Sequence, residues 1–172
     1  LDETASKTEE WVAGNQKYIF IGIGAIAFVL LGYLIYSKVF SAPKEAEAAN
    51  EVFQANSYFN QAINVNVNDK VLDGLATRDS LFNLALNGGD GKFGYLNIIK
   101  NYSGTNAANL ANYSAGIAYL NLNKYELAIG HLQDFSSDDI IIGAKAKGAI
   151  GDAFVQLDQL DVALGHYENA FK

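Results

Sequence analysis

The longest hydrophobic pattern of the chain lies near its start. Residues 18–37 read YIFIGIGAIAFVLLGYLIYS without one charged side chain, and Lys17 and Lys38 flank them. Twenty helical residues extend about 30 Å, the thickness of a bilayer's hydrocarbon core, and tyrosines stand at both ends of the run, where an aromatic belt forms. The pattern predicts a membrane-spanning helix over residues 18–40. The preceding flank, residues 1–17, is polar and is expected to have little structure of its own.

Two other interpretations of this run are a buried core helix and a cleaved secretory signal. A core helix of this length normally carries a polar stripe, and the apolar region of a signal is usually shorter. The best small-residue exit, after Ala42, would place Phe40 where a small residue is needed. Both alternatives are therefore disfavoured.

After the span, the pattern becomes that of amphipathic helices. Pro43 is expected in the first turn of the next helix, because proline is tolerated there. Apolar positions recur at helical spacing in residues 44–64, 71–87 and 93–102. The glycine-rich residues 88–94, GGDGKFG, interrupt this pattern and read as a turn between helices.

A self-similarity follows. Residues 116–132, GIAYLNLNKYELAIGHL, recur 35 positions later as residues 151–167, GDAFVQLDQLDVALGHY. Both copies hold a small residue, an aromatic residue three positions later, an alanine twelve positions later and a bulky apolar residue four beyond that. We expect two helical hairpins, over residues 106–135 and 140–171, with small residues buried where the paired helices cross. These small residues are Gly116, Ala128, Gly151 and Ala163.

This spacing is that of tetratricopeptide repeats, although Asn112 and Lys147 stand where that motif has a tryptophan. The sequence therefore predicts an all-α fold, with a single transmembrane helix followed by a tetratricopeptide-repeat α-solenoid over residues 44–172. Repeats of this kind are binding scaffolds, and their surface residues select the partner.

Composition narrows the classes of function. The 172 residues carry a formal charge of −7, and Arg78 is the one arginine. A nucleic-acid-binding protein would show a basic face, so nucleic acid is not expected as a partner. The chain has no cysteine, which excludes disulfides and thiolate zinc sites.

Motifs for catalysis are lacking. His131 and His166 occupy equivalent repeat positions, but no HExxH-like cluster accompanies them, so we interpret them as helix-surface or interface residues rather than as metal ligands. No serine lies in a GxSxG context, and residues 88–94 lack the phosphate-binding GxxxxGK[ST] pattern. We therefore expect no catalytic, cofactor-binding or metal-binding residues, and no enzyme activity.

Small residues in the span form a smooth side. Gly22, Ala25 and Gly32 are candidates for contact with another membrane helix, although the strict GxxxG spacing is absent. Ordinary glycine content of membrane helices is the alternative.

The order of acidic flank, single span, linker helix and hairpins resembles the YfgM-like family. In particular, GTNAANLANYSAGIAYLNLNKYELAIGHLQDFSSDD (residues 104–139) and GAIGDAFVQLDQLDVALGHYENA (residues 148–170) are similar to the membrane-anchored tetratricopeptide proteins of Bacteroidota-type bacteria. The resemblance implies a protein of the bacterial inner membrane with a cytoplasmic N terminus and periplasmic repeats. Lysines are evenly split around the span, so the orientation comes from the resemblance alone.

The same resemblance implies partners. The YfgM-like family associates with the SecYEG translocon and a PpiD-type chaperone, and assists newly translocated proteins in a chaperone-like role. Unfolded client polypeptides and membrane lipid are further expected partners. The alternative is a structural scaffold that recruits a fixed partner to another envelope complex.

A partner groove can be placed by analogy with tetratricopeptide stacks, in which the first helix of each hairpin lines the concave face. The alternative is that the partner is held through the span or the terminal helix. Transferring the geometry gives five candidate groove residues with polar or amphipathic side chains: Tyr113, Asn121, Lys145, Asp152 and Gln156.

Overall fold

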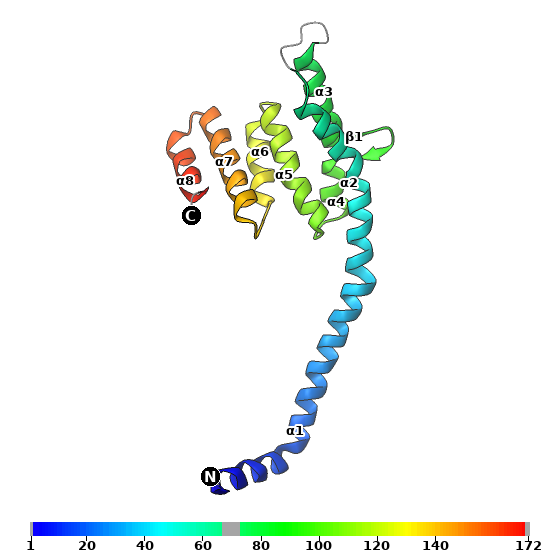
Figure 1. Ribbon diagram of the computed structural model, residues 1–172, viewed down its shortest axis with the longest axis vertical. Coiled ribbons are helices and arrows are strands. Elements are labelled where there is room, and N and C mark those ends of the chain that lie inside the picture. The colour runs from blue at the N-terminus through cyan, green and yellow to red at the C-terminus, as the bar shows by residue number, and fades with distance from the viewer. Residues whose placement is uncertain (1, 67–72, 171–172) are drawn as a thin grey trace. The chain divides into compact units, whose positions relative to one another are not determined.

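The structure is a computed structural model that describes residues 2–66 and 73–170, with the backbone alone for residues 2–10. It is predominantly helical, as predicted (Figure 1). The chain divides into two compact units, Leu1–Pro43 and Lys44–Lys172.

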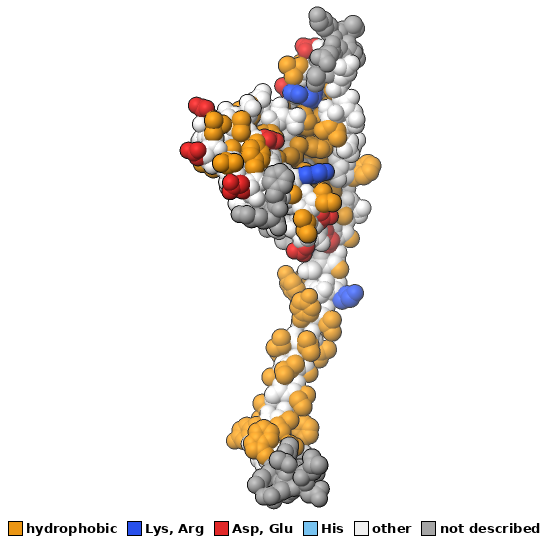
Figure 2. Space-filling view, turned by 60° about the vertical axis from the view of Figure 1, so that its left-hand side comes forward, with side chains coloured by type: hydrophobic (Ala, Val, Ile, Leu, Met, Phe, Trp, Pro, Cys, Tyr) orange, Lys and Arg blue, Asp and Glu red, His pale blue; other side chains and the backbone are white. Residues whose placement is uncertain are grey.

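The first unit contains α1 (Asp2–Ile35) and a π-helical segment (Tyr36–Ser41). Helix α1 includes the polar flank, so the expectation of little structure there was wrong. The flank contains three Glu, two Lys and two Ala, which favour helices. Among the described residues, this is the one helix long and apolar enough to cross a membrane, and none of its most apolar stretch is buried. Figure 2 shows hydrophobic side chains along the part of this helix that follows residue 10.

The π-helical segment is explained by the proline that follows it. Pro43 has no N–H to donate to the carbonyl of Val39, four residues earlier, and its ring would crowd that carbonyl. The N–H of Ala42 bonds instead to the carbonyl of Ser37, five residues earlier. The helix therefore widens by one π-type turn. Pro43 itself lies in the first turn of the next helix, as predicted.

The second unit holds the remaining elements. They are α2 (Ala42–Ile63, which belongs to this unit from Lys44), α3 (Gly74–Asn87), β1 (Gly88–Gly89), β2 (Lys92–Phe93), α4 (Tyr95–Asn101), α5 (Asn106–Asn121), α6 (Tyr125–Asp134), α7 (Ile140–Gln156) and α8 (Leu160–Ala170). Predicted and observed helices differ by a few residues at their ends. Two residues of the predicted helix over residues 71–87, Val71 and Leu72, lie outside the described residues.

The glycine-rich segment is a small β-hairpin rather than an irregular turn. Strands β1 and β2 are antiparallel, with Gly88 opposite Phe93. Gly88, Asp90 and Gly91 all have positive φ angles, and the carboxylate of Asp90 accepts a 2.7 Å hydrogen bond from the hydroxyl of Tyr58. The short helix predicted over residues 93–102 is consequently shorter, because Phe93 belongs to β2.

Helices α5 and α6 pack against each other, as do α7 and α8. A Cβ atom placed on Gly116 would lie 2.5 Å from Cγ of Leu132, and one on Gly151 would lie 2.6 Å from the Tyr167 ring. Ala128, which is 0% exposed, is buried at the first crossing. Ala163 is buried at the second. The predicted burial of all four small residues is confirmed.

The turns inside the two hairpins are alike as well. Asn123 and Asp158 both adopt left-handed conformations, with φ of 58° and 59°. In each turn, the N–H of the following residue donates a hydrogen bond to the backbone carbonyl five residues earlier. Lys124 donates to Tyr119, and Gln159 donates to Phe154. This Schellman pattern ends the first helix of each hairpin in the same way. The sequence repeat is therefore a repeat of backbone structure.

Side chains cap the first helices. Thr105 accepts a hydrogen bond from the N–H of Ala108 at the start of α5. Asp139 accepts hydrogen bonds from the N–H groups of Ile141 and Ile142 at the start of α7, the N-cap role for which aspartate is preferred.

Helix α2 is part of the folded domain. Ala48, Ala55 and Ala62 are fully buried, and Phe59 packs edge-on against Phe82 and Tyr95. Ile63, at the end of the helix, is exposed.

The start of α2 is tied to the start of α5. The Glu45 carboxylate accepts hydrogen bonds from the N–H groups of Asn106, at 2.7 Å, and Ala107, at 3.1 Å. Beside it, Lys44 donates to the carbonyl of Ser103, and Tyr102 donates to Glu47. These contacts fix the point where the chain enters the domain.

Candidate functional site

Three helices that are far apart in the sequence, α3, α5 and α7, contribute side chains to one pocket. Its volume is about 330 Å³. It lies beside the turn between α5 and α6, and most of its lining is polar but uncharged. The lining residues are Arg78, Leu120, Asn121, Asn123, Tyr125, Asp152 and Gln156.

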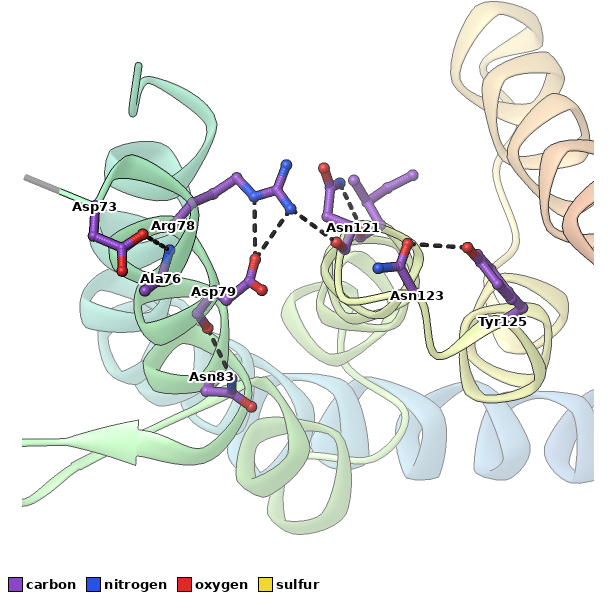
Figure 3. A network of polar contacts seen from close by, with 9 residues as sticks. Asp73, Ala76, Arg78, Asp79, Asn83, Asn121, Asn123 and Tyr125 are labelled. Atoms are coloured by element: carbon purple, nitrogen blue, oxygen red, sulfur yellow. Dashed lines mark hydrogen bonds and ion pairs between the residues drawn. The ribbon is translucent and has the colours of Figure 1, made fainter. Parts of the chain in front are cut away.

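Arg78 links α3 to α5 (Figure 3). Its Nε and Nη2 atoms donate to Oδ1 of Asp79, at 3.2 Å and 3.0 Å, and Nη2 also donates to the backbone carbonyl of Asn121 at 3.2 Å. The guanidinium charge is thus balanced by a neighbouring carboxylate. The side-chain NH2 group of Asn121 donates to the backbone carbonyl of Ile117, so the side-chain oxygen of Asn121 is directed away from that carbonyl.

The opposite wall of the pocket comes from α7. Asp152 accepts a 2.7 Å hydrogen bond from the hydroxyl of Tyr167, and this bond is the main cause of the raised pKa of Tyr167. The hydroxyl of Tyr125 lies 2.9 Å from Oδ1 of Asn123 and 3.4 Å from Oε1 of Gln156. Since a hydroxyl has one hydrogen, it satisfies only one of these oxygens at a time.

Of the five predicted groove residues, the structure brings three together. Asn121, Asp152 and Gln156 line the pocket. Tyr113 packs against Phe135, with ring centroids 5.2 Å apart, and burial raises the pKa of its hydroxyl. Lys145 is exposed and lies outside the pocket lining.

Arg78, Asn123 and Tyr125 were not predicted as site residues. The only available signal was that Arg78 is the one arginine in the chain. Its placement depends on how α3 packs beside α5, and the spacing of residues within α3 does not contain that information.

The two histidines have equivalent structural roles. His131 stacks on Tyr119 and His166 stacks on Phe154, each pair inside one hairpin, with ring centroids 5.4 Å and 5.3 Å apart. Nδ1 of His131 lies 2.9 Å from Oδ1 of Asn112, and burial lowers the pKa of this imidazole. Asn112, where a tetratricopeptide motif has tryptophan, thus contacts the second helix through a polar side chain.

No group of three or more His, Asp or Glu side chains within the described part of the chain could hold a metal ion. The pocket residues are hydrogen-bond donors and acceptors without an adjacent pair of nucleophile and base. Such an arrangement suits binding.

Helix α8 carries exposed apolar side chains on its outer face. Leu164 is 58% exposed, whereas Ile129, its equivalent in the first hairpin, is 9% exposed because α7 covers it. In Figure 2, which turns this side forward, hydrophobic side chains gather there among acidic ones.

The candidate contact residues of the span lie on α1. Gly22, Ala25 and Gly32 are all exposed, and a Cβ atom on either glycine would meet nothing within 4 Å. This side of the helix is therefore open to close approach.

Comparison with known proteins adds no relative: no protein-family model matches the chain, and neither a curated protein nor a solved structure matches it.

Proposed function

We propose that this protein is a membrane-anchored tetratricopeptide-type adaptor that binds a protein partner in the pocket between α3, α5 and α7. The repeated crossings and turns of the two hairpins support the tetratricopeptide assignment, because they recur with the period of the sequence repeat. The exposed apolar helix supports anchoring through a single span.

The pocket is the observation that carries the binding role. It presents amide groups from Asn121 and Gln156 and one carboxylate from Asp152, while the charge of Arg78 is balanced by Asp79. Amides both donate and accept hydrogen bonds, so this surface can pair with the backbone of a peptide segment of almost any sequence. A chaperone-like adaptor requires such tolerance.

For the cellular role we propose association with the SecYEG translocon and a PpiD-type chaperone, and assistance to newly translocated, unfolded polypeptides. This follows from the YfgM-like resemblance, which also gives the bacterial inner membrane as the location, with a cytoplasmic N terminus and a periplasmic domain. The role is one of binding and not of catalysis.

The decisive experiment is co-purification from gently solubilised membranes. Replacing Asn121 and Gln156 together with alanine should reduce recovery of SecY and the PpiD-type protein several-fold. The matched control replaces Asn60 and Gln61, an exposed pair of the same residue types on α2, and should leave recovery unchanged. Equal recovery from both variants would place the interaction outside the pocket. Recovery of a different envelope complex without SecY would favour the scaffold role.

Membrane orientation needs a separate test. Asp138 and Glu3 would each be replaced by a cysteine in separate variants. A membrane-impermeant thiol reagent would then be applied from the outer side of the inner membrane. Asp138 should react and Glu3 should not. The reverse labelling would place the helical domain in the cytoplasm and remove the translocon role.

A further inference from the structure

Three large apolar side chains of the second hairpin are left uncovered. Val155, at the end of α7, is 38% exposed, and Leu160 and Leu164, on α8, are 60% and 58% exposed. The spacing of four residues places the two leucines on the same side of α8. We refer to Val155, Leu160 and Leu164 as the outer stripe.

The first hairpin shows what covers these positions when they are buried. The equivalents of the outer stripe, 35 positions earlier, are Leu120, Tyr125 and Ile129. All three belong to the hydrophobic cluster that the first hairpin forms with α7. The buried side of α7 contributes small and apolar residues to this cluster, namely Ala146, Ala149, Ile150 and Ala153. A helix with a narrow apolar side therefore fits this surface.

Exposure at a neighbouring position has a different origin. Val162 is 45% exposed, and its equivalent in the first hairpin, Leu127, is 50% exposed. This position faces solvent in both hairpins, whether or not another helix follows. The outer stripe differs, because its equivalents are covered in the first hairpin.

Part of this surface is less apolar in the second hairpin than in the first. Tyr113 and Ile117 pack against the same cluster, and their equivalents are Gly148 and Asp152. A complete hairpin docked across the whole surface would meet a carboxylate in place of an isoleucine. The apolar area that remains lies beside the turn between α7 and α8, and one helix can cover it.

Acidic side chains border the outer stripe. Residues 148–170 contain no Lys or Arg and four carboxylates, which are those of Asp152, Asp158, Asp161 and Glu168. All four residues are exposed. The equivalent residues 113–135 contain two carboxylates and one lysine, so the formal charge is −4 in the second hairpin and −1 in the first. The repeat itself therefore does not require this excess of negative charge.

We propose that the outer stripe docks an amphipathic helix of a partner protein that carries Lys or Arg beside its apolar side. An apolar stripe with an acidic border is complementary to such a helix in both shape and charge. A second copy of this chain is a poorer occupant, because pairing the same surface would bring two acidic borders together. None of the three stripe residues lines the pocket between α3, α5 and α7, so this surface is additional to the proposed adaptor site.

Site-specific photocrosslinking of the full chain in dodecyl maltoside micelles tests the proposal. Because the chain has no cysteine, benzophenone can be attached through Asp161→Cys, next to Leu160, or through Glu126→Cys, the equivalent exposed position of the first hairpin. The probe is a synthetic amphipathic helix with leucines on one side and lysines beside them. A control peptide has glutamate at every lysine position.

We expect the lysine peptide to crosslink several-fold more at position 161 than at position 126, and several-fold more than the glutamate peptide at position 161. Leu160→Asn combined with Leu164→Asn should abolish this excess, whereas the matched control Val162→Asn should leave it intact. Circular dichroism should be unchanged in these variants, because the replaced side chains are exposed. Asn121→Ala with Gln156→Ala should also leave the crosslink intact, which separates the outer stripe from the pocket.

Four outcomes would overturn the proposal. Equal crosslinking at positions 161 and 126 would show that the peptide binds acidic surface in general. A crosslink that survives the loss of both leucines would place the peptide outside the stripe. Equal crosslinking of the two peptides would exclude a basic partner. A crosslink between two copies of the chain that the lysine peptide does not displace would assign the stripe to self-association.

Discussion

The glycine at the first helix crossing should not tolerate even one added methyl group. In a helix interior, Gly→Ala normally stabilises by about 1 kcal/mol, because alanine is the better helix former. At Gly116 the new Cβ would lie 2.5 Å from Cγ of Leu132 and 3.2 Å from the backbone oxygen of Ala128. Neither neighbour is the free end of a flexible side chain, so we expect overpacking to cost about 1–3 kcal/mol.

Gly148 is the matched control, because it also lies inside a helix and a Cβ there would meet nothing within 4 Å. The propensity gain is common to both sites and cancels. Gly116→Ala should therefore be less stable than Gly148→Ala by about 1–3 kcal/mol. Gly151→Ala should fall between them, because the Tyr167 ring that it meets belongs to the last helix and is only partly buried.

Urea unfolding of the 44–172 fragment, followed by circular dichroism, measures these differences directly. The m-value should stay constant across the three variants, so that the midpoints report stability. If Gly116→Ala and Gly148→Ala shift the urea midpoint by the same amount and in the same direction, the close crossing of α5 and α6 is refuted.

Two further expectations follow from the polar contacts. Glu45→Ala should destabilise the same fragment by about 1–2 kcal/mol in urea unfolding, because two N–H groups at the start of α5 lose a charged acceptor. Glu45→Gln should destabilise it less. An unchanged urea midpoint for Glu45→Ala would contradict the contact. Burial lowers the pKa of His131 below 6.5, so the unfolded chain takes up a proton first as the pH falls. The free energy of unfolding should therefore decrease as the pH falls from about 6.5 to the folded-state pKa. His131→Gln should reduce this dependence on pH, as measured by urea unfolding at a series of pH values. An identical dependence in the variant would exclude His131 as its source.

The parts of the fold that depend on local spacing were predictable. Gly116 and Ala128 are buried because the repeat alignment places them at a crossing, and Asp139 caps α7 because an acidic residue before an apolar run is a helix start. The β-hairpin was missed, although its two-residue loop, Asp90-Gly91, is a pair that favours hairpin turns. The hydrogen bond from Tyr58 to Asp90, 32 positions apart, is a contact that local spacing does not contain.

The candidate site shows the same division. Helical spacing and the repeat analogy placed Asn121, Asp152 and Gln156 on one surface, and they line one pocket. The same analogy included Tyr113, but an aromatic side chain next to Phe135 gains more from packing than from facing a groove. Arg78 was missed because a tertiary contact alone brings α3 to the pocket.

The attachment of α2 to the rest of the domain determines what a protease would release. A cut within residues 41–43, between the predicted span and Lys44, would separate the domain from its anchor and leave Glu45 bonded to α5 and the buried alanines of α2 in place. A cut inside α2 would instead expose Phe82 and Tyr95, which Phe59 covers. The release of an intact, soluble domain is therefore possible through one narrow window of the chain, and cleavage beyond that window would commit the domain to degradation.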